Sequence, residues 1–274
     1  MTTRIVELKK PRLKNPVFIG GLPGVGNVGR IAAGYLVEEL KAVKFAELYS
    51  SHFMPFVLVQ QGSTVHVLKN EFYYWKPKRR KRGQQDLIIL IGDSQSINPE
   101  GHYEVVEEIL NYLKKFGIKE MFNLAGLGVG EKKDKPEVIG VVNDPKLMKK
   151  YKKYGIKFDT GDRVGTIVGA AGLLLGLGAR IGIKGMCLLG ETSGAPLIPD
   201  PKAAESVLNT LTKMLKIKVD TSEIQKKVKE MEGFIKRMEK MQRTALMQLM
   251  KGRMGEPTGK GKEGEEEEEL SYIG

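Results

Sequence analysis

The chain has 274 residues, a formal net charge of +12 at pH 7 and a single cysteine, Cys187. This length can bury a substantial core, while one cysteine excludes an internal disulfide framework and fits a reducing compartment. The longest uncharged stretch, residues 164–179, is shorter than the roughly 20 residues that a membrane-spanning helix needs. We therefore expect a cytoplasmic protein without a membrane partner.

Residues 16–40 form the unit around which we expect the rest of the fold to pack. A short apolar strand at residues 17–19 precedes a turn rich in glycine, and a helix that begins with small residues follows. Glycine permits backbone angles and close approaches that a Cβ atom would prevent. The pattern predicts a turn that packs this helix tightly against a sheet.

The same turn resembles two phosphate-binding motifs. A P-loop is excluded, because Asn27 and Val28 stand where its lysine and its serine or threonine are needed. Residues 24–29 match the dinucleotide-binding pattern G-x-G-x-x-G, but the predicted strand already ends at Ile19, and Glu47 is the one candidate for the acid that this motif needs about 20 residues later. A structural turn is preferred; a nucleotide-binding enzyme that uses Gly24 to Gly29 is the alternative, and an anion site or partner surface is the third possibility.

The next segments indicate antiparallel strands and then a basic loop. Strand-like patterns occur at residues 43–48, 57–60, 65–68 and 72–75. Six of the seven residues in 76–82 are lysine or arginine. Such a run could contact a phosphate backbone, but a solvated loop between strands is preferred, so nucleic acid is not expected as a partner.

The middle of the chain alternates strands with helices. Strands are predicted at residues 86–92, 120–124, 138–142 and 186–189, and helices at 103–116, 145–154, 165–179 and 203–215. The helix at 165–179 is expected to be buried, and a second glycine cluster follows at 126–130. This order predicts a three-layer α/β fold, with a mostly parallel or mixed central sheet and helices on both faces.

Catalytic and metal-binding patterns are weak. Residues 92–94 read Gly-Asp-Ser, as in the nucleophile block of one group of lipases and esterases, but those enzymes need a histidine late in the chain and the last one here is His102. The three histidines have no ligand spacing to each other or to Cys187, which is expected to be a small buried residue. We expect no metal, no cofactor and no catalytic residues.

Beyond residue 219 the character of the sequence changes. Residues 220–223 resemble a capping box, and apolar residues then recur at spacings of four and three. We assign oligomerisation to the stripe; packing on the chain's own body or on a foreign partner are the alternatives. Its oligomerisation residues are Ile224, Val228, Met231, Ile235, Met238 and Leu249. Residues 252–269 read as a flexible acidic tail, and apolar character returns at 270–274.

Several blocks resemble the proteasome assembly chaperone family in its archaeal branch. The collinear blocks are GLPGVGNVGRIAAGYLVEEL, DLIILIGDSQ, NLAGLGVGE, VGTIVGAAGLLL and CLLGETSGAPLIPDPKAAESVL, within residues 16–215. The resemblance implies a phosphorylase-like three-layer α/β fold without known catalytic activity. It also implies binding to proteasome α subunits or to the α ring.

Members of that family often end in a hydrophobic-Tyr-X peptide that enters pockets between neighbouring α subunits. Here Tyr272 is third from the end, and Ser271 precedes it in place of an apolar residue. By this resemblance the partner-binding residues are Leu270, Tyr272, Ile273 and Gly274. The departure shifts the terminal carboxylate by one residue relative to the tyrosine.

The sequence thus predicts three parts and one function. Residues 1–219 form the α/β domain, 220–251 a long amphipathic helix and 252–274 a tail with a terminal recognition peptide. The predicted function is that of a non-enzymatic proteasome-associated chaperone or adaptor, a homo-oligomer that presents several tethered peptides. Linked copies would gain avidity on a symmetric ring.

Overall fold

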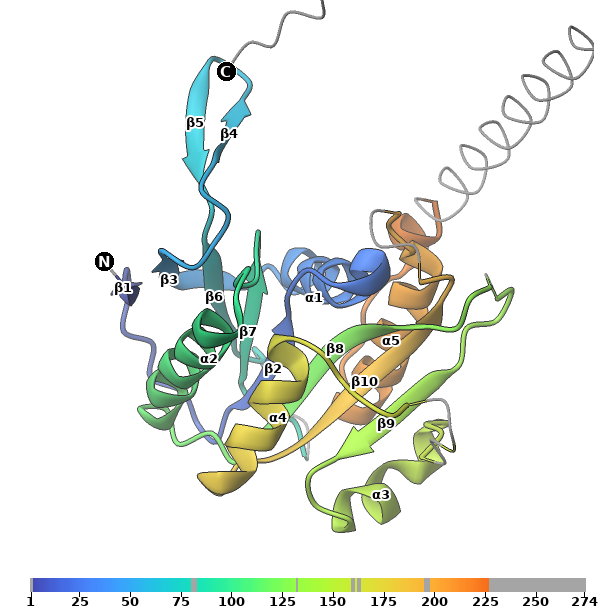
Figure 1. Ribbon diagram of the computed structural model, residues 1–274. Helices are drawn as coiled ribbons and strands as arrows, with labels where there is room; N and C mark the ends of the chain where they lie inside the picture. Colours follow the sequence, from blue (N-terminus) through green and yellow to red (C-terminus); the bar gives the residue numbers. More distant parts are fainter. Residues whose placement is uncertain are drawn as a thin grey trace, which may run out of the picture. The chain divides into compact units, whose positions relative to one another are not determined.

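An eight-stranded mixed sheet forms the centre of the fold (Figure 1). The computed structural model describes residues 2–79, 83–131, 133–158, 161, 164–194 and 198–226. The strand order is β1-β3-β6-β7-β2-β8-β10-β9. These strands are β1 (Thr3–Glu7), β2 (Val17–Gly21), β3 (Val43–Ser50), β6 (Asn70–Trp75), β7 (Leu87–Gly92), β8 (Glu120–Gly128), β9 (Val138–Val142) and β10 (Lys184–Thr192).

The four central strands are parallel and the outer strands are antiparallel. β2 pairs in parallel with β7 and β8, and β8 pairs in parallel with β10. Strands β1, β3 and β6 extend the sheet on one side, and β9 closes the other. Every residue of β2 and β7 is buried, as expected for parallel strands covered on both faces.

Helices cover both faces of this sheet. One face packs against α1 (Val28–Glu39), α3 (Lys146–Tyr151) and α5 (Pro201–Leu215), and the other against α2 (Pro99–Lys114) and α4 (Ala170–Arg180). Short 3-10 turns lie at Val25–Asn27 and Lys152–Tyr154. This three-layer arrangement with a mixed sheet confirms the predicted α/β fold class. Across the described ranges, no helix has both the length and the apolar character to cross a membrane.

Helix starts follow from side-chain caps. Asn98 Oδ1 accepts a hydrogen bond from the Gly101 amide at 2.7 Å and begins α2, while Asp200 Oδ1 accepts one from the Ala203 amide at 3.0 Å and begins α5. Each helix has proline in its first turn, where the missing N–H costs no internal bond. Both helices therefore begin where their sequences favour it.

Several expected boundaries differ from those in the structure. β2 continues past Ile19 to Gly21, and β8 continues to Gly128 through most of the second glycine cluster. The helix expected from residue 165 begins at Ala170, because Gly169 has a φ of 88° and the Gln95 side chain accepts the Ala170 amide. That helix is half-buried rather than buried, since Gly176 and Ala179 on it are exposed.

Ile224 is a core residue of the α/β body. Asp220 Oδ1 accepts the Ser222 amide at 3.0 Å, and a helical turn covers residues 222–226. Ile224 has no exposed surface and joins the cluster built by α1 and α5, where Tyr35 also donates to the Asp220 carbonyl at 2.9 Å. The assignment of Ile224 to an oligomer surface is therefore wrong, because its side chain packs within the chain's own core.

The other residues assigned to oligomerisation and partner binding lie outside the described residues. They are Val228, Met231, Ile235, Met238, Leu249, Leu270, Tyr272, Ile273 and Gly274.

Candidate functional site

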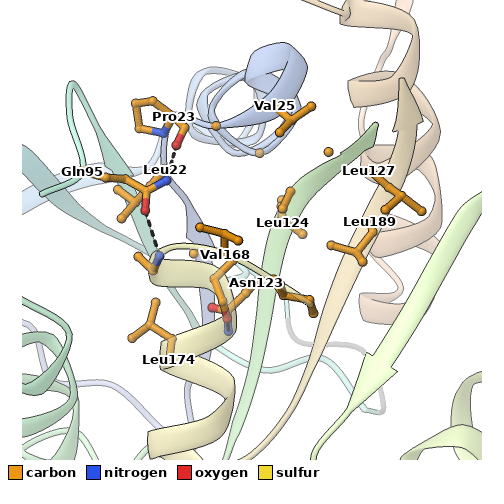
Figure 2. Close-up of a pocket in the computed structure, with 18 of the residues that line it drawn as sticks. Leu22, Pro23, Val25, Gln95, Asn123, Leu124, Leu127, Val168, Leu174 and Leu189 are labelled. Carbon is orange, nitrogen blue, oxygen red and sulfur yellow. Dashed lines mark hydrogen bonds between the residues drawn. The ribbon is translucent and has the colours of Figure 1, made fainter. Parts of the chain in front are cut away.

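A cavity of about 230 Å³ lies at the carboxyl ends of β2 and β8 (Figure 2). In open α/β sheets the loops that follow parallel strands meet at this edge, where ligands commonly bind. Two glycine-rich segments, residues 22–25 and 125–128, form opposite walls, and the segment before α4 forms a third. The topology thus brings together two glycine clusters that lie about a hundred residues apart in the sequence.

The glycines of this site mainly allow close packing. A Cβ atom on Gly29 would overlap the carbonyl oxygen of Leu124, and one on Gly126 would overlap the carbonyl oxygen of Val25. Gly26 has a φ of 60° and lies against Thr192, in the left-handed region that favours glycine. These contacts support the predicted packing turn between α1 and the sheet.

Gln95 joins two walls of the cavity. Its Nε2 donates to the carbonyl oxygen of Pro23, and its Oε1 accepts a hydrogen bond from the Ala170 amide at 2.8 Å. Figure 2 shows this side chain between the loop after β2 and the start of α4. One amide therefore holds together three segments that are distant in sequence.

The cavity is apolar apart from a few neutral polar groups. Asn123, 1% exposed, lies on its β8 wall; its Nδ2 donates to the Ala171 carbonyl at 3.1 Å, and its Oδ1, which faces Gly20, has no hydrogen-bond partner among the described residues. None of the residues that line the cavity is charged. This lining suits an uncharged apolar group better than a phosphate, which favours basic partners.

Glu47, the candidate acid of a dinucleotide site, lies elsewhere. Its strand β3 is separated from β2 by β6 and β7. Its carboxylate accepts hydrogen bonds from Lys44 at 2.7 Å, Lys69 at 2.7 Å and Tyr49 at 2.8 Å. Burial opposes ionisation, but these three bonds lower the pKa of Glu47 to about 2. Glu47 therefore stabilises the β3–β6 region and does not face the glycine turn.

The Gly-Asp-Ser block forms a turn rather than a nucleophile site. Ser94 Oγ donates to the Gln95 carbonyl at 2.8 Å, and Asp93 Oδ2 lies 2.6 Å from His66 Nε2 and 3.2 Å from the Lys69 amide. Cys187 is buried, as expected, and burial raises the pKa of its thiol to about 12. Across the described residues, no group of three or more His, Cys, Asp or Glu side chains could hold a metal ion.

The basic segment occupies the opposite edge of the sheet from the cavity. It connects the end of β6 with the start of β7, and its described cations Lys76, Lys78 and Arg79 are exposed. This placement agrees with the preferred solvated loop. Residues 80–82 lie outside the described part of the chain.

Comparison with known proteins assigns the family. The model of the PAC2 family matches residues 18–239. The chain belongs to the PAC2 family. A curated relative, an uncharacterized protein of Methanocaldococcus jannaschii, is 37% identical over 272 residues, which are 99% of this chain and 97% of the relative.

Two solved structures from Pyrococcus furiosus are similar to this PAC2 family protein. PbaB, an archaeal proteasome activator, is 42% identical, with a TM-score of 0.81, and the match covers 87% of this chain and 99% of PbaB. PbaA, an archaeal homolog of proteasome-assembly chaperone, is 34% identical, with a TM-score of 0.68, and the match covers 89% and 99% of the two chains. Both likenesses extend over nearly the whole of the known structures.

Sequence reasoning missed two residues of this PAC2 family cavity. Gln95 lies in a short polar run after a strand and belongs to no binding motif. Nothing in the sequence indicates its hydrogen bonds with Pro23, which lies 72 residues earlier, and with Ala170, which lies 75 residues later. Asn123 does carry a signal, because it is an amide inside the otherwise uncharged apolar run 121–128 of β8. A buried amide in such a strand needs partners from another element.

Proposed function

We propose that this chain is a proteasome-associated chaperone or adaptor without catalytic activity, which binds α subunits or the α ring and assists its assembly or activation. The observation that carries the proposal is the 42% identity to PbaB over 99% of that structure. The likeness to PbaA, which is a homolog of a proteasome-assembly chaperone, supports the same class of partner. The cavity, which lacks charged lining residues and a metal-binding cluster within the described ranges, gives no comparable support to an enzyme.

The proposal includes a homo-oligomer that presents several copies of the carboxyl-terminal peptide. Tyr272 is the anchor, because its ring can be buried in a pocket while its hydroxyl group forms a hydrogen bond. Leu270, Ile273 and Gly274 complete the peptide, and residues 252–269 separate it from the rest of the chain. Linked weak contacts on a ring of repeated subunits would gain affinity through avidity.

The experiment is a binding titration of full-length chain against proteasome α subunits and assembled α rings. Tyr272→Ala should weaken binding at least tenfold and leave the thermal stability and the oligomer mass unchanged. Tyr103→Ala is the matched control, because Tyr103 is 51% exposed on α2 and lies far from the terminal peptide in sequence. Equal binding by all three proteins would remove the peptide from the mechanism, and no binding by the wild type would refute the proposed function.

The alternative function is a nucleotide-binding enzyme that uses Gly24 to Gly29. It draws support from the position of the cavity, which borders Gly24 and Gly29 at the carboxyl edge of the sheet. A titration of the wild type with NAD, FAD and ATP separates the two functions. We expect no saturable binding, whereas a dissociation constant in the micromolar range would favour the enzyme.

A further inference from the structure

A β-hairpin between β3 and β6 extends away from the central sheet (Figure 1). It consists of β4 (Val57–Gln60) and β5 (Thr64–Val67), which pair only with each other in a separate two-stranded sheet. Val57 lies opposite Val67, and Val59 lies opposite Val65. Directly opposed residues of an antiparallel pair share one face, so these four side chains form a single surface, the valine face.

The valine face is exposed to solvent. Its residues Val57, Val59, Val65 and Val67 have relative exposures of 45%, 77%, 66% and 56%. Leu58 on the opposite face of the hairpin and Phe56 before β4 are also exposed. A contiguous apolar patch of this kind marks an interaction surface, and a two-stranded hairpin alone is only marginally stable in water. The other large exposed apolar residues of the described body lie on several different elements.

The charge of the chain indicates which partner can cover this face. The whole chain has 45 basic and 33 acidic residues, yet residues 53–68 contain no Lys, Arg, Asp or Glu. Two copies of a chain with a formal charge of +12 repel each other, so they associate best through an uncharged surface. An acidic foreign partner would instead be recognised through basic side chains. The valine face of another copy has matching size and chemistry, as in a self-complementary interface.

We propose that the valine face packs against a second copy of this chain. This inference rests on the homo-oligomer of the proposed function and places its contact on the α/β body.

The base of the hairpin is anchored, which presents the valine face in a defined orientation. His66 Nε2 lies 2.6 Å from Asp93 Oδ2, and the same oxygen accepts the Lys69 amide at 3.2 Å. The Asp93 amide donates to the Lys69 carbonyl at 3.0 Å. These bonds join the hairpin to the residue after β7, so less conformational freedom is lost when a partner binds.

The test is the mass of the full-length chain in solution, measured by light scattering over a dilution series. Val59→Asp together with Val65→Asp introduces two like charges into each face, so the dissociation constant for self-association should rise at least tenfold and the mass should fall. Circular dichroism should show the wild-type secondary structure. Leu8→Asp is the matched control, because Leu8 is 48% exposed directly after β1 and lies outside both the hairpin and the cavity lining; its mass should equal that of the wild type.

A second variant guards against loss of the hairpin itself. Val59→Thr with Val65→Thr keeps β-branched side chains that favour strands and adds polar groups, so self-association should weaken several-fold while the hairpin persists.

The outcomes separate this inference from the proposed function. An unchanged mass in both double variants overturns the valine face as the contact between copies, even if α subunits still bind. Loss of α-subunit binding at unchanged mass also overturns it and assigns the hairpin to a foreign partner. A monomeric wild type refutes both this inference and the proposed oligomer. A lower mass in a protein that never binds α subunits supports the valine face and refutes only the proposed function.

Discussion

The cavity region and the β4–β5 hairpin are both uncharged and apolar, but they differ in what covers their side chains. Around the cavity, Gly29 and Gly126 let α1 and the loop after β2 approach β8 so closely that no Cβ atom fits. In the hairpin, Val59 and Val65 pair across two strands and remain mostly exposed. The cavity region is packed by atoms of the same chain, whereas the valines of the hairpin have no side chains of the described body packed over them.

This difference separates the residues that maintain the fold from those available to a partner. Changes at the buried glycines should alter the free energy of unfolding, because the neighbouring atoms are backbone and cannot move aside cheaply. Changes on the valine face should alter association. This distinction would be wrong if substitutions in both regions changed the unfolding free energy and the association of the chain to the same extent.

The largest effect is expected at Gly29. Gly29→Ala would force a methyl group against the Leu124 carbonyl on the adjacent strand. Overpacking costs about 1 to 3 kcal/mol of unfolding free energy, and the loss here should lie at the upper end because the obstacle is backbone. Urea unfolding followed by circular dichroism measures this loss. The control is Gly24→Ala, since Gly24 has an extended φ of −179° and its nearest atom would be the Gln95 amide at 3.8 Å. Equal losses at both positions would show that the close approach of α1 to β8 does not govern stability.

Much of this fold follows from local sequence. The apolar run in β7 and the β-rich pattern of β4 and β5 depend on neighbouring residues, so the bounds of these strands are predicted to within one residue. The periodicity of α2 predicts the helix, but α2 begins at Pro99, four residues before the expected residue 103. The strand order could not be predicted in this way. β3 follows β2 in sequence, but β6 and β7 lie between the two strands in the sheet, and that separation places Glu47 away from the glycine turn.

The candidate site was predicted only in part. Both glycine clusters were noticed, yet nothing local shows that they face each other, because their contact depends on the parallel pairing of β2 with β8. The burial of Ile224 was missed for a related reason. Its spacing fits a heptad stripe equally well, and only the position of α1 and α5 makes it part of the core.

A second effect concerns the strands that carry the hairpin. Lys69, directly before β6, donates to Glu47 on β3, and Lys44 on β3 donates to both Glu47 and Glu71 of β6. These bonds lower the pKa of Glu47 to about 2 from its ordinary value of 4.5. The unfolded chain binds this proton more readily, so the contribution is full above about pH 5 and disappears as the pH falls toward 2.

Glu47→Gln should therefore cost about 2 to 3 kcal/mol of unfolding free energy at pH 7 and progressively less on acidification. Denaturant unfolding of wild type and variant from pH 7 to pH 3 gives this difference directly. Glu107→Gln, at an exposed position of α2, is the control and should change stability little at any pH. A difference that does not depend on pH would assign the effect of Glu47 to packing instead of charge.

The smallest effect should occur at Gly176, and its sign should be opposite. Gly176 lies on the exposed side of α4, with no atom within 4 Å of an added Cβ and no positive φ. Glycine inside a helix has more backbone freedom to lose on folding than alanine, so Gly176→Ala should raise the unfolding free energy by about 0.5 to 1 kcal/mol.

Gly172 on the same helix provides the contrast, because its Cβ would overlap the Ile167 carbonyl beside the cavity. Gly172→Ala should lower the melting temperature, whereas Gly176→Ala should raise it by a few degrees. A loss of stability at Gly176 would mean that other atoms also cover this side of α4. Solvent exposure in the structure would then not be a sufficient sign that the hairpin is available to a partner.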